Sequence, residues 1–235
     1  MTPRATVRLQ FNRDFTLDDA AEWVPYYAAL GISHLYASPL FAARPGSGHG
    51  YDVIDPREIN PELGGYAALL RLSRTLARHG MGLILDIVPN HMAADAANAW
   101  WWDVLLWGPA SRHAAFFDID WQDPDPALRG KLLLPILGDT LQACLTRGEI
   151  TLDIDEDAGL FVGRYFDARF PIDPRGYGEI LDIGGPGWSG LRHGAEQLRS
   201  LDGAAFDSAA VELRTDLSDR FRVARPAERE SLLSR

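Results

Sequence analysis

The segment LILDIVPNH (residues 83–91) is the most informative part of the sequence, because an apolar run ends there in a group of polar residues. The run is typical of a buried parallel strand, which rarely tolerates a carboxylate like Asp86 unless a partner or a task accounts for it. Pro89 forces the backbone off the strand just before Asn90 and His91. Polar groups at the carboxyl end of a parallel strand are where β/α barrels build their active sites. We therefore favour a functional role for Asp86, Asn90 and His91 over a buried aspartate satisfied by backbone N–H groups.

Strands and helices alternate upstream of this stretch. Three strands are expected at about residues 6–9, 32–37 and 82–88, and two helices at about residues 16–30 and 66–79. Pro25 is expected to kink or divide the first helix. This order predicts right-handed βαβ units and a parallel sheet. The Gly- and Pro-rich segment at residues 38–65 is expected to be a long functional loop.

The pattern changes after His91. Residues 92–190 are irregular and rich in Trp, Asp, Gly and Pro, with strands expected at 149–154 and 160–165, and residues 191–235 are expected to be helical. The predicted fold class is α/β: a partial (β/α)8 TIM barrel of three βα units, an inserted subdomain after the third strand and a helical C-terminal segment. The expected domains are therefore residues 1–91, 92–190 and 191–235.

Composition excludes several classes of function. The chain has 235 residues, a net charge of −10 and 46% hydrophobic residues, which favours a globular protein and argues against nucleic acid or an anionic membrane as a partner. The single cysteine, Cys144, excludes an intrachain disulfide and is expected to be a structural thiol. No signal-peptide core and no apolar run of about 20 residues is present. We expect a cytoplasmic location.

The residues His49, Tyr51 and Asp52 suggest sugar binding. An aromatic ring beside a carboxylate is how proteins hold a pyranose, because the ring packs on the apolar C–H face and the acid accepts from hydroxyls. A tyrosine packed in a loop, with Asp52 capping a turn, is the alternative. The tryptophans at 100–102, with Trp107 and Trp121, could stack on a glucan, but most of them are expected to be structural.

Retaining glycoside chemistry needs two carboxyl groups about 5–5.5 Å apart. Asp52, Asp55, Asp86 and Asp103 qualify only by residue type, and no spacing in the sequence assigns either role. The acidic run at 153–157 lacks the glycine and the distal glutamate of a calcium loop. We therefore expect no metal and no cofactor.

Several motifs together resemble those of a known enzyme family. DIVPNH (86–91) resembles the first signature region of the α-amylase superfamily. A narrower resemblance lies in the segments TVRLQ (6–10), LGISHLYASP (30–39), ARPGSGHGYDV (43–53), NPELGG (60–65), PNHMA (89–93), FFDIDW (116–121), LPILG (134–138) and RYF (164–166). These segments resemble the malto-oligosyltrehalose synthase family. It covers roughly residues 5–180, and the combination is highly specific. Val7 departs from the family, which usually has tyrosine at that position.

The resemblance implies an enzyme that converts the reducing-end α-1,4 linkage of a maltodextrin into an α,α-1,1 linkage, in an intramolecular transglycosylation with retention. It implies that Tyr51 stacks on the transferred sugar, that His91 binds its hydroxyls, and that His49 and Asp52 support this subsite. Asp86 would be a structural acid that positions an arginine on the next strand, and Asn90 would brace the loop. None of these is the expected nucleophile.

The family's catalytic carboxylates are expected on later strands, beyond Arg235, because no Arg-x-Asp-His-type motif follows residue 191. We therefore expect an N-terminal fragment that is inactive by itself, with a C-terminal complementing polypeptide as an open question. The expected partner is a maltodextrin. An α-amylase-type glucan hydrolase, a non-catalytic maltodextrin-binding protein and a fragment without function are the alternatives.

Overall fold

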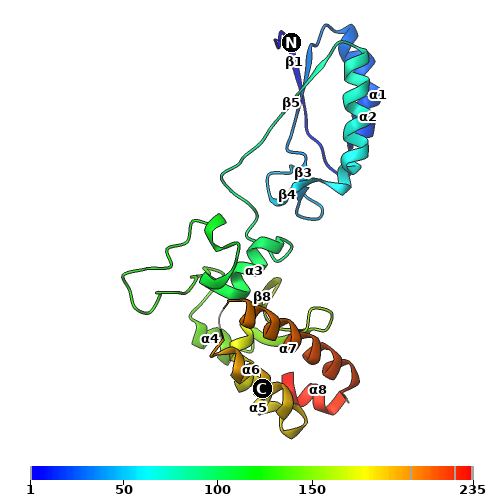
Figure 1. The fold of residues 1–235 in the computed structure, drawn as a ribbon. Coiled ribbons are helices and arrows are strands. Elements are labelled where there is room, and N and C mark those ends of the chain that lie inside the picture. Colours follow the sequence, from blue (N-terminus) through cyan, green and yellow to red (C-terminus); the bar gives the residue numbers. More distant parts are fainter. Residues whose placement is uncertain (1, 202, 225, 234–235) are drawn as a thin grey trace. The chain divides into compact units, whose positions relative to one another are not determined.

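In the computed structural model, which describes residues 2–201, 203–224 and 226–233, the chain forms two units, Met1–Ala99 and Trp100–Arg235 (Figure 1). The elements of the first unit are β1 (Thr6–Leu9), α1 (Leu17–Ala29), β2 (His34–Ala37), β3 (Phe41–Ala43), β4 (Val53–Ile59), the 3-10 helix η1 (Pro61–Leu63), α2 (Gly65–Arg78) and β5 (Gly82–Leu85). The division into barrel, inserted subdomain and helical segment stays a prediction.

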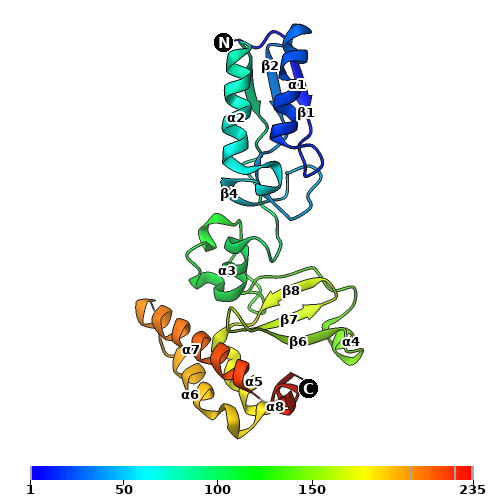
Figure 2. The same ribbon diagram turned by 90° about the vertical axis from the view of Figure 1, so that its right-hand side faces the viewer.

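The first unit has a three-stranded parallel sheet in the order β1-β2-β5. Figure 1 shows α1 and α2 on the same side of this sheet, and Figure 2 shows the two helices next to each other. Thr16 begins α1 with the expected capping box, and α2 lies where its apolar periodicity predicts. The alternation of strands and helices thus gives the βαβ units that the sequence predicts.

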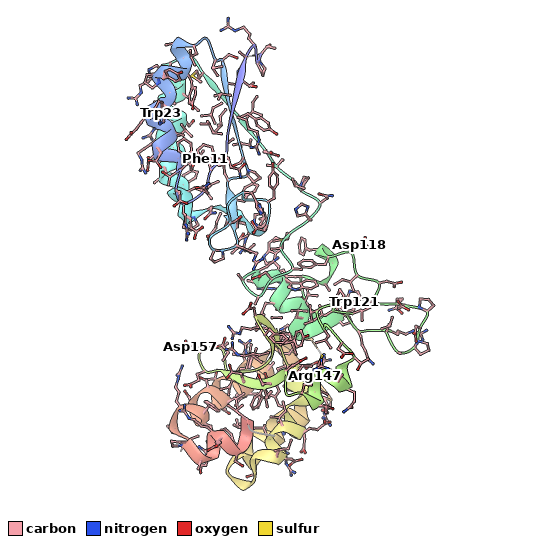
Figure 3. All side chains as sticks on the ribbon, turned by 180° about the vertical axis from the view of Figure 1, so that it is seen from behind. Phe11, Trp23, Asp118, Trp121, Arg147 and Asp157 are labelled. Atoms are coloured by element: carbon pink, nitrogen blue, oxygen red, sulfur yellow. The ribbon has the colours of Figure 1, made fainter. Side chains whose placement is uncertain are left out.

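Alternation along the strands places the core of the first unit. Leu9, Leu35, Ala37 and Leu83 point toward the helices, and the hydrophobic cluster there includes Leu17, Val24, Leu63, Leu72 and Leu76. Phe11 belongs to this cluster and is 1% exposed, whereas Trp23 on α1 is 52% exposed. Both side chains are labelled in Figure 3. The opposite strand face, which carries Arg8 and Tyr36, is therefore left for polar contacts.

One prediction about these elements is wrong, and one alternative of another is excluded. The third strand ends at Leu85, and it is not buried, since Leu85 is 47% and Ile87 56% exposed. The reason is that β5 is an edge strand with β2 as its single neighbour. Pro25 does not divide α1, which is continuous from Leu17 to Ala29, so a kink is the part of that expectation that stays a prediction. Pro25 is exposed, so the carbonyl oxygen of the preceding turn, which lacks an N–H donor because of the proline, can accept a hydrogen bond from water.

The segment at 38–65 is more ordered than the predicted loop. It contains the antiparallel pair β3 and β4, whose register shifts twice. Pro56 lies inside β4, and proline is tolerated at bulges and edges because it has no backbone N–H to donate. This strand pair cannot be predicted from the sequence, because its high content of Gly and Pro usually indicates a loop.

The second unit combines a small antiparallel sheet with helices (Figure 2). Its elements are α3 (Ala99–Trp107), η2 (Gly108–Ala110), η3 (Ala114–Phe116), α4 (Leu141–Thr146), β6 (Ile150–Asp155), β7 (Leu160–Tyr165), β8 (Ala168–Pro171), η4 (Pro174–Gly176), α5 (Tyr177–Gly184), η5 (Pro186–Trp188), α6 (Ser189–Leu198), α7 (Gly203–Val223) and α8 (Pro226–Leu233). The strands at 150–155 and 160–165 confirm two predictions, and β8 is additional.

Helices cover the sheet of the second unit. The buried cluster joins β7 to α5, α6 and α7 through Phe161, Tyr177, Leu198 and Leu217. Of the segment at 191–235 that is predicted to be helical, residues 202, 225 and 234–235 lie outside the described residues. Within the described part of the chain, no helix has the length and apolar character needed to cross a membrane.

Candidate carbohydrate-binding site

The candidate site begins at the carboxyl end of the parallel sheet. Asp86 follows β5 directly, and its backbone N–H donates to the carbonyl oxygen of Ala37 at 3.0 Å, which extends the pairing with β2. Its side chain is 16% exposed, so the carboxylate is largely but not fully removed from water. A carboxylate in this position needs hydrogen-bond donors, and two other segments supply them.

Tyr51, Asp86 and Arg8 form a closed polar network. The Tyr51 hydroxyl donates to Asp86 Oδ2 at 2.5 Å and accepts from Arg8 Nη2 at 3.0 Å. Arg8 Nη2 also lies 3.6 Å from Asp86 Oδ2, and its guanidinium lies 5.6 Å from the centroid of the Tyr36 ring. The network joins β1, the end of β5 and the loop that carries Tyr51, so it fixes the phenol relative to the sheet.

The hydrogen bonds of the network shift the pKa values of its three members. The hydrogen bond from Tyr51 lowers the pKa of Asp86 below its ordinary value, although burial opposes it. The same bond raises the pKa of Tyr51, with burial acting in the same direction. The hydrogen bond to Tyr51 raises the pKa of Arg8. Asp86 is therefore ionised, and Tyr51 remains the donor between them.

The loop before Tyr51 is held by short-range hydrogen bonds. The Ser47 hydroxyl donates to Asp52 Oδ1 and accepts from the backbone N–H of Gly50 at 3.1 Å. Gly50 has φ +77°, and a Cβ there would lie 2.6 Å from the carbonyl oxygen of Pro39. Glycine is needed because the loop both adopts a left-handed conformation and approaches the end of β2 closely. Asp52 thus acts mainly within the turn.

The two histidines flank Tyr51. His49 Nδ1 accepts from the Tyr51 backbone N–H at 3.0 Å, and the two rings stack with centroids 5.9 Å apart. Asp52 Oδ1 lies 3.7 Å from the same nitrogen. His91 Nε2 lies 3.1 Å from the Tyr51 carbonyl oxygen and must therefore carry the proton.

This tautomer leaves Nδ1 of the exposed His91 able to accept a hydrogen bond from a ligand hydroxyl. Asn90 is exposed in the turn before His91, and its supporting role stays a prediction. The structure thus brings together His49, Tyr51, Asp52, Asp86 and His91 around one short loop. The arrangement offers an aromatic ring, a carboxylate and an imidazole to a hydroxylated ligand, which is the chemistry of carbohydrate recognition.

Sequence reasoning missed Arg8, Gln10 and Ser47 as site residues. Gln10 Nε2 donates to the carbonyl oxygen of Gly48 at 2.9 Å, and its Oε1 accepts from Arg8 Nη1 at 2.9 Å. A signal existed in the alternation of the first strand, which places Arg8 and Gln10 on the same face at its carboxyl end. This signal is weak, because the strand has only four residues and polar side chains are common at exposed strand ends.

The expected tryptophan cluster packs against rings of its own unit. Trp100 stacks on His113 with centroids 5.4 Å apart, and Trp101 tilts against Phe117 at 5.2 Å. Neighbouring tryptophans therefore serve different contacts. Among the residues that the structure describes, no group of three or more His, Cys, Asp or Glu side chains is placed to hold a metal ion.

Comparison with known proteins places this geometry in a family. A model described as "Alpha amylase, catalytic domain" matches residues 15–132, about half of the chain. The "Putative maltooligosyl trehalose synthase" of Mycobacterium tuberculosis (strain ATCC 25618 / H37Rv) is 52% identical over 126 residues, which cover 53% of this chain and 16% of that protein.

Two solved structures are also similar. "Crystal Structure of Maltooligosyl trehalose synthase" has 41% identity and a TM-score of 0.66, covering 72% of this chain and 22% of that chain. The maltooligosyltrehalose synthase of Arthrobacter ramosus has 43% identity and a TM-score of 0.63, covering 73% and 21%. The chain thus spans about a fifth of the length of these relatives. On the match to its catalytic-domain model, the chain belongs to the alpha-amylase family.

Proposed function

We propose that the chain forms the sugar-binding N-terminal part of a malto-oligosyltrehalose synthase, which converts the reducing-end α-1,4 linkage of a maltodextrin into an α,α-1,1 linkage. The network of Tyr51, Asp86 and Arg8 carries this proposal, because it presents an aromatic ring in a fixed position at the carboxyl end of a parallel sheet. The similarity to maltooligosyl trehalose synthases over more than two thirds of the chain supports the narrower choice within the family.

In this proposal each site residue has a role that its contacts support. Tyr51 stacks on the transferred glucose. Asp86 and Arg8 bind the Tyr51 hydroxyl, so the phenol ring of Tyr51 cannot turn. His91 accepts from a sugar hydroxyl through Nδ1. His49 and Asp52 keep the loop in place. The three parallel strands belong to a partial (β/α)8 barrel, followed by an inserted subdomain and helices.

We infer that the catalytic carboxylates come from polypeptide outside the 235 residues, either in the same protein or in a complementing one. The reaction needs a nucleophile and an acid/base about 5–5.5 Å apart, and no pair in this chain is assigned to those roles. The chain by itself is then expected to bind maltodextrin without rearranging it. Formation of an α,α-1,1 linkage by the purified chain, read from anomeric proton NMR signals, would contradict this inference.

Calorimetric titration of maltohexaose into the purified chain tests the binding role. Saturable binding is expected, with Tyr51→Ala weakening it by about 10-fold or more through loss of the ring contact. Tyr66→Ala is the matched control, because Tyr66 is 66% exposed on α2 and lies outside the site. Equal affinities of the two variants, or no saturable binding at all, would overturn the assignment of Tyr51.

A glucan hydrolase is the second candidate, because the matching model describes the alpha-amylase family as a whole. The same ring, carboxylate and imidazole would serve either reaction, since both begin with a glucose unit held at the same subsite. The two are separated in the protein that contains the catalytic carboxylates. A synthase yields chiefly the α,α-1,1-linked isomer of the substrate, whereas a hydrolase yields shorter reducing sugars.

A further inference from the structure

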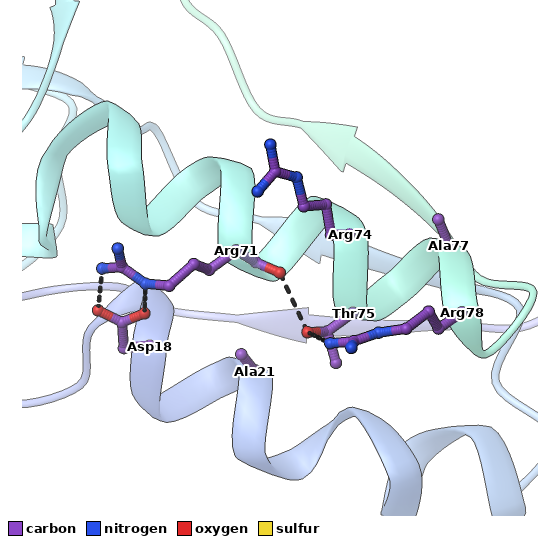
Figure 4. A pocket seen from close by; sticks show the side chains of 7 residues that line it. All are labelled: Asp18, Ala21, Arg71, Arg74, Thr75, Ala77 and Arg78. Carbon is purple, nitrogen blue, oxygen red and sulfur yellow. Dashed lines mark hydrogen bonds and ion pairs between the residues drawn. The ribbon is translucent and has the colours of Figure 1, made fainter.

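A groove between α1 and α2 is lined by charged side chains that the site at Tyr51 does not use. Its volume is ≈ 680 Å³, and it lies on the helical side of the parallel sheet (Figure 4). Both helices contribute to its lining, which consists of Asp18, Ala21, Arg71, Arg74, Thr75, Ala77 and Arg78. Small-molecule sites commonly have volumes of about 300–1,000 Å³, so the groove is large enough for a ligand.

Two arginines of the groove meet no carboxylate among the described residues. Arg71 donates two hydrogen bonds to Asp18, each 2.7 Å long, so these two charges are paired. Arg78 Nη2 donates to Thr75 Oγ1 at 3.0 Å, and Arg74 makes no hydrogen bond or ion pair within the described part of the chain. Three guanidinium groups and one carboxylate leave the groove positive in a chain with a net charge of −10.

This positive charge is not explained by helix stability. Arg74 and Arg78 are four residues apart on one face of α2, and like charges at that spacing destabilise a helix. The helix dipole favours Arg78, which lies in the last turn, and gives less support to Arg74 one turn earlier. An anion bound between the two guanidinium groups would remove the repulsion.

The arginines can reach a shared ligand. Figure 4 shows the Arg71 guanidinium over Asp18, that of Arg78 beside Thr75, and that of Arg74 directed away from α1. Arg74 and Arg78 are both exposed, and exposed side chains change rotamer within nanoseconds. Since their Cβ atoms are neighbours on the helix surface, both guanidinium groups can turn toward one anion at the mouth of the groove.

We propose that this groove binds a phosphorylated monosaccharide, with its phosphate between Arg74 and Arg78 and its hydroxyls toward Asp18. The guanidinium fork matches phosphate oxygens with paired hydrogen bonds. The Asp18 carboxylate repels a phosphate but accepts from hydroxyls, so it orients the ligand. Ala21 and Ala77 leave room for the sugar ring. The proposal stands independently of the proposed glucan chemistry.

Calorimetric titration of the purified chain with glucose 6-phosphate, glucose and inorganic phosphate at constant ionic strength tests the proposal. Glucose 6-phosphate is expected to bind saturably and more tightly than either of the others. Arg74→Gln and Arg78→Gln are each expected to lower the affinity for glucose 6-phosphate by about 10-fold, because each removes a charge-assisted hydrogen bond to the phosphate. Arg112→Gln is the matched control, because it makes the same charge change at an exposed residue of the other unit.

A further variant separates the sugar from the phosphate. Asp18→Asn is expected to weaken the binding of glucose 6-phosphate, because it removes an acceptor for the sugar hydroxyls. The same change is expected to strengthen the binding of inorganic phosphate, because it removes a repulsive charge. Circular dichroism of each variant establishes that α2 is intact. Equal affinity for phosphate and glucose 6-phosphate, an equal loss in Arg112→Gln, or no saturable binding would overturn the proposal and leave a solvated helix face.

Discussion

Three glycines in the loop before Tyr51 allow a graded test of how this loop is held against the sheet. Gly48 has an ordinary φ and open space around its Cβ position, Gly46 has φ +76° and open space, and Gly50 has φ +77° and the Pro39 carbonyl oxygen at 2.6 Å. Alanine at Gly48 is therefore expected to meet neither conformational strain nor a clash. Alanine at Gly46 meets the strain of a left-handed backbone alone, and alanine at Gly50 meets this strain together with a clash against the Pro39 backbone.

The expected losses of stability follow from those two penalties. Gly48→Ala is expected to be neutral or to stabilise by up to about 1 kcal/mol through the unfolded state. Gly46→Ala is expected to cost about 1–2 kcal/mol, the penalty of a left-handed conformation for an L-residue. Gly50→Ala adds overpacking of about 1–3 kcal/mol, for a total of about 2–5 kcal/mol, since a carbon atom and a carbonyl oxygen cannot remain 2.6 Å apart.

Native-state hydrogen exchange of the amides in α1 and α2 measures these losses, because it reports the first unit separately from the second. A second measurement is the Asp86 pKa from its carboxyl ¹³C shift. In Gly50→Ala the loop moves away, Tyr51 leaves Asp86, and this pKa rises toward its ordinary value, whereas in Gly46→Ala it stays low. Equal losses for Gly46→Ala and Gly50→Ala would refute the close approach to Pro39, and an unchanged Asp86 pKa would refute its link to the site.

Three further predictions concern protonation, burial and capping. Tyr51→Phe should raise the pKa of Asp86. The lowered pKa of this group in the folded state stabilises the fold above the ordinary carboxyl pKa, and the stabilisation is lost as pH falls through the folded-state pKa. Acid unfolding of the variant should therefore depend less on pH in that range. Tyr177→Phe should cost about 1–3 kcal/mol in denaturant unfolding of the second unit, because it leaves the buried Phe161 N–H without its 3.0 Å acceptor. Burial raises the Tyr177 pKa, so ionisation of this phenol favours the unfolded state above the ordinary tyrosine pKa. The stability of the variant should therefore fall less steeply with rising pH in the alkaline range. Thr16→Ala should cost about 1 kcal/mol in exchange of the α1 amides, and no change would show that the capping box contributes nothing.

Local elements and the type of chemistry can be predicted from the amino-acid sequence alone. The apolar periodicity of residues 66–79 and the capping box at Thr16 fixed two helices to within a residue or two, because side-chain spacing and end-capping are local. The residues around Tyr51 and His91 indicated a sugar site, since an aromatic ring, carboxylates and imidazoles within short segments suit few other ligands.

Which side chains contact one another depends on the tertiary fold. Arg8 and Tyr51 are 43 residues apart in sequence and Tyr51 and Asp86 are 35 apart, yet they share one hydrogen-bonded network. Parallel strands bring such distant residues to one edge of a sheet, and no local pattern encodes which strand lies beside which. The same reason explains why the exposed edge of β5 and the pairing of β3 with β4 were not predicted: burial and strand pairing depend on neighbours that the chain acquires only when it folds.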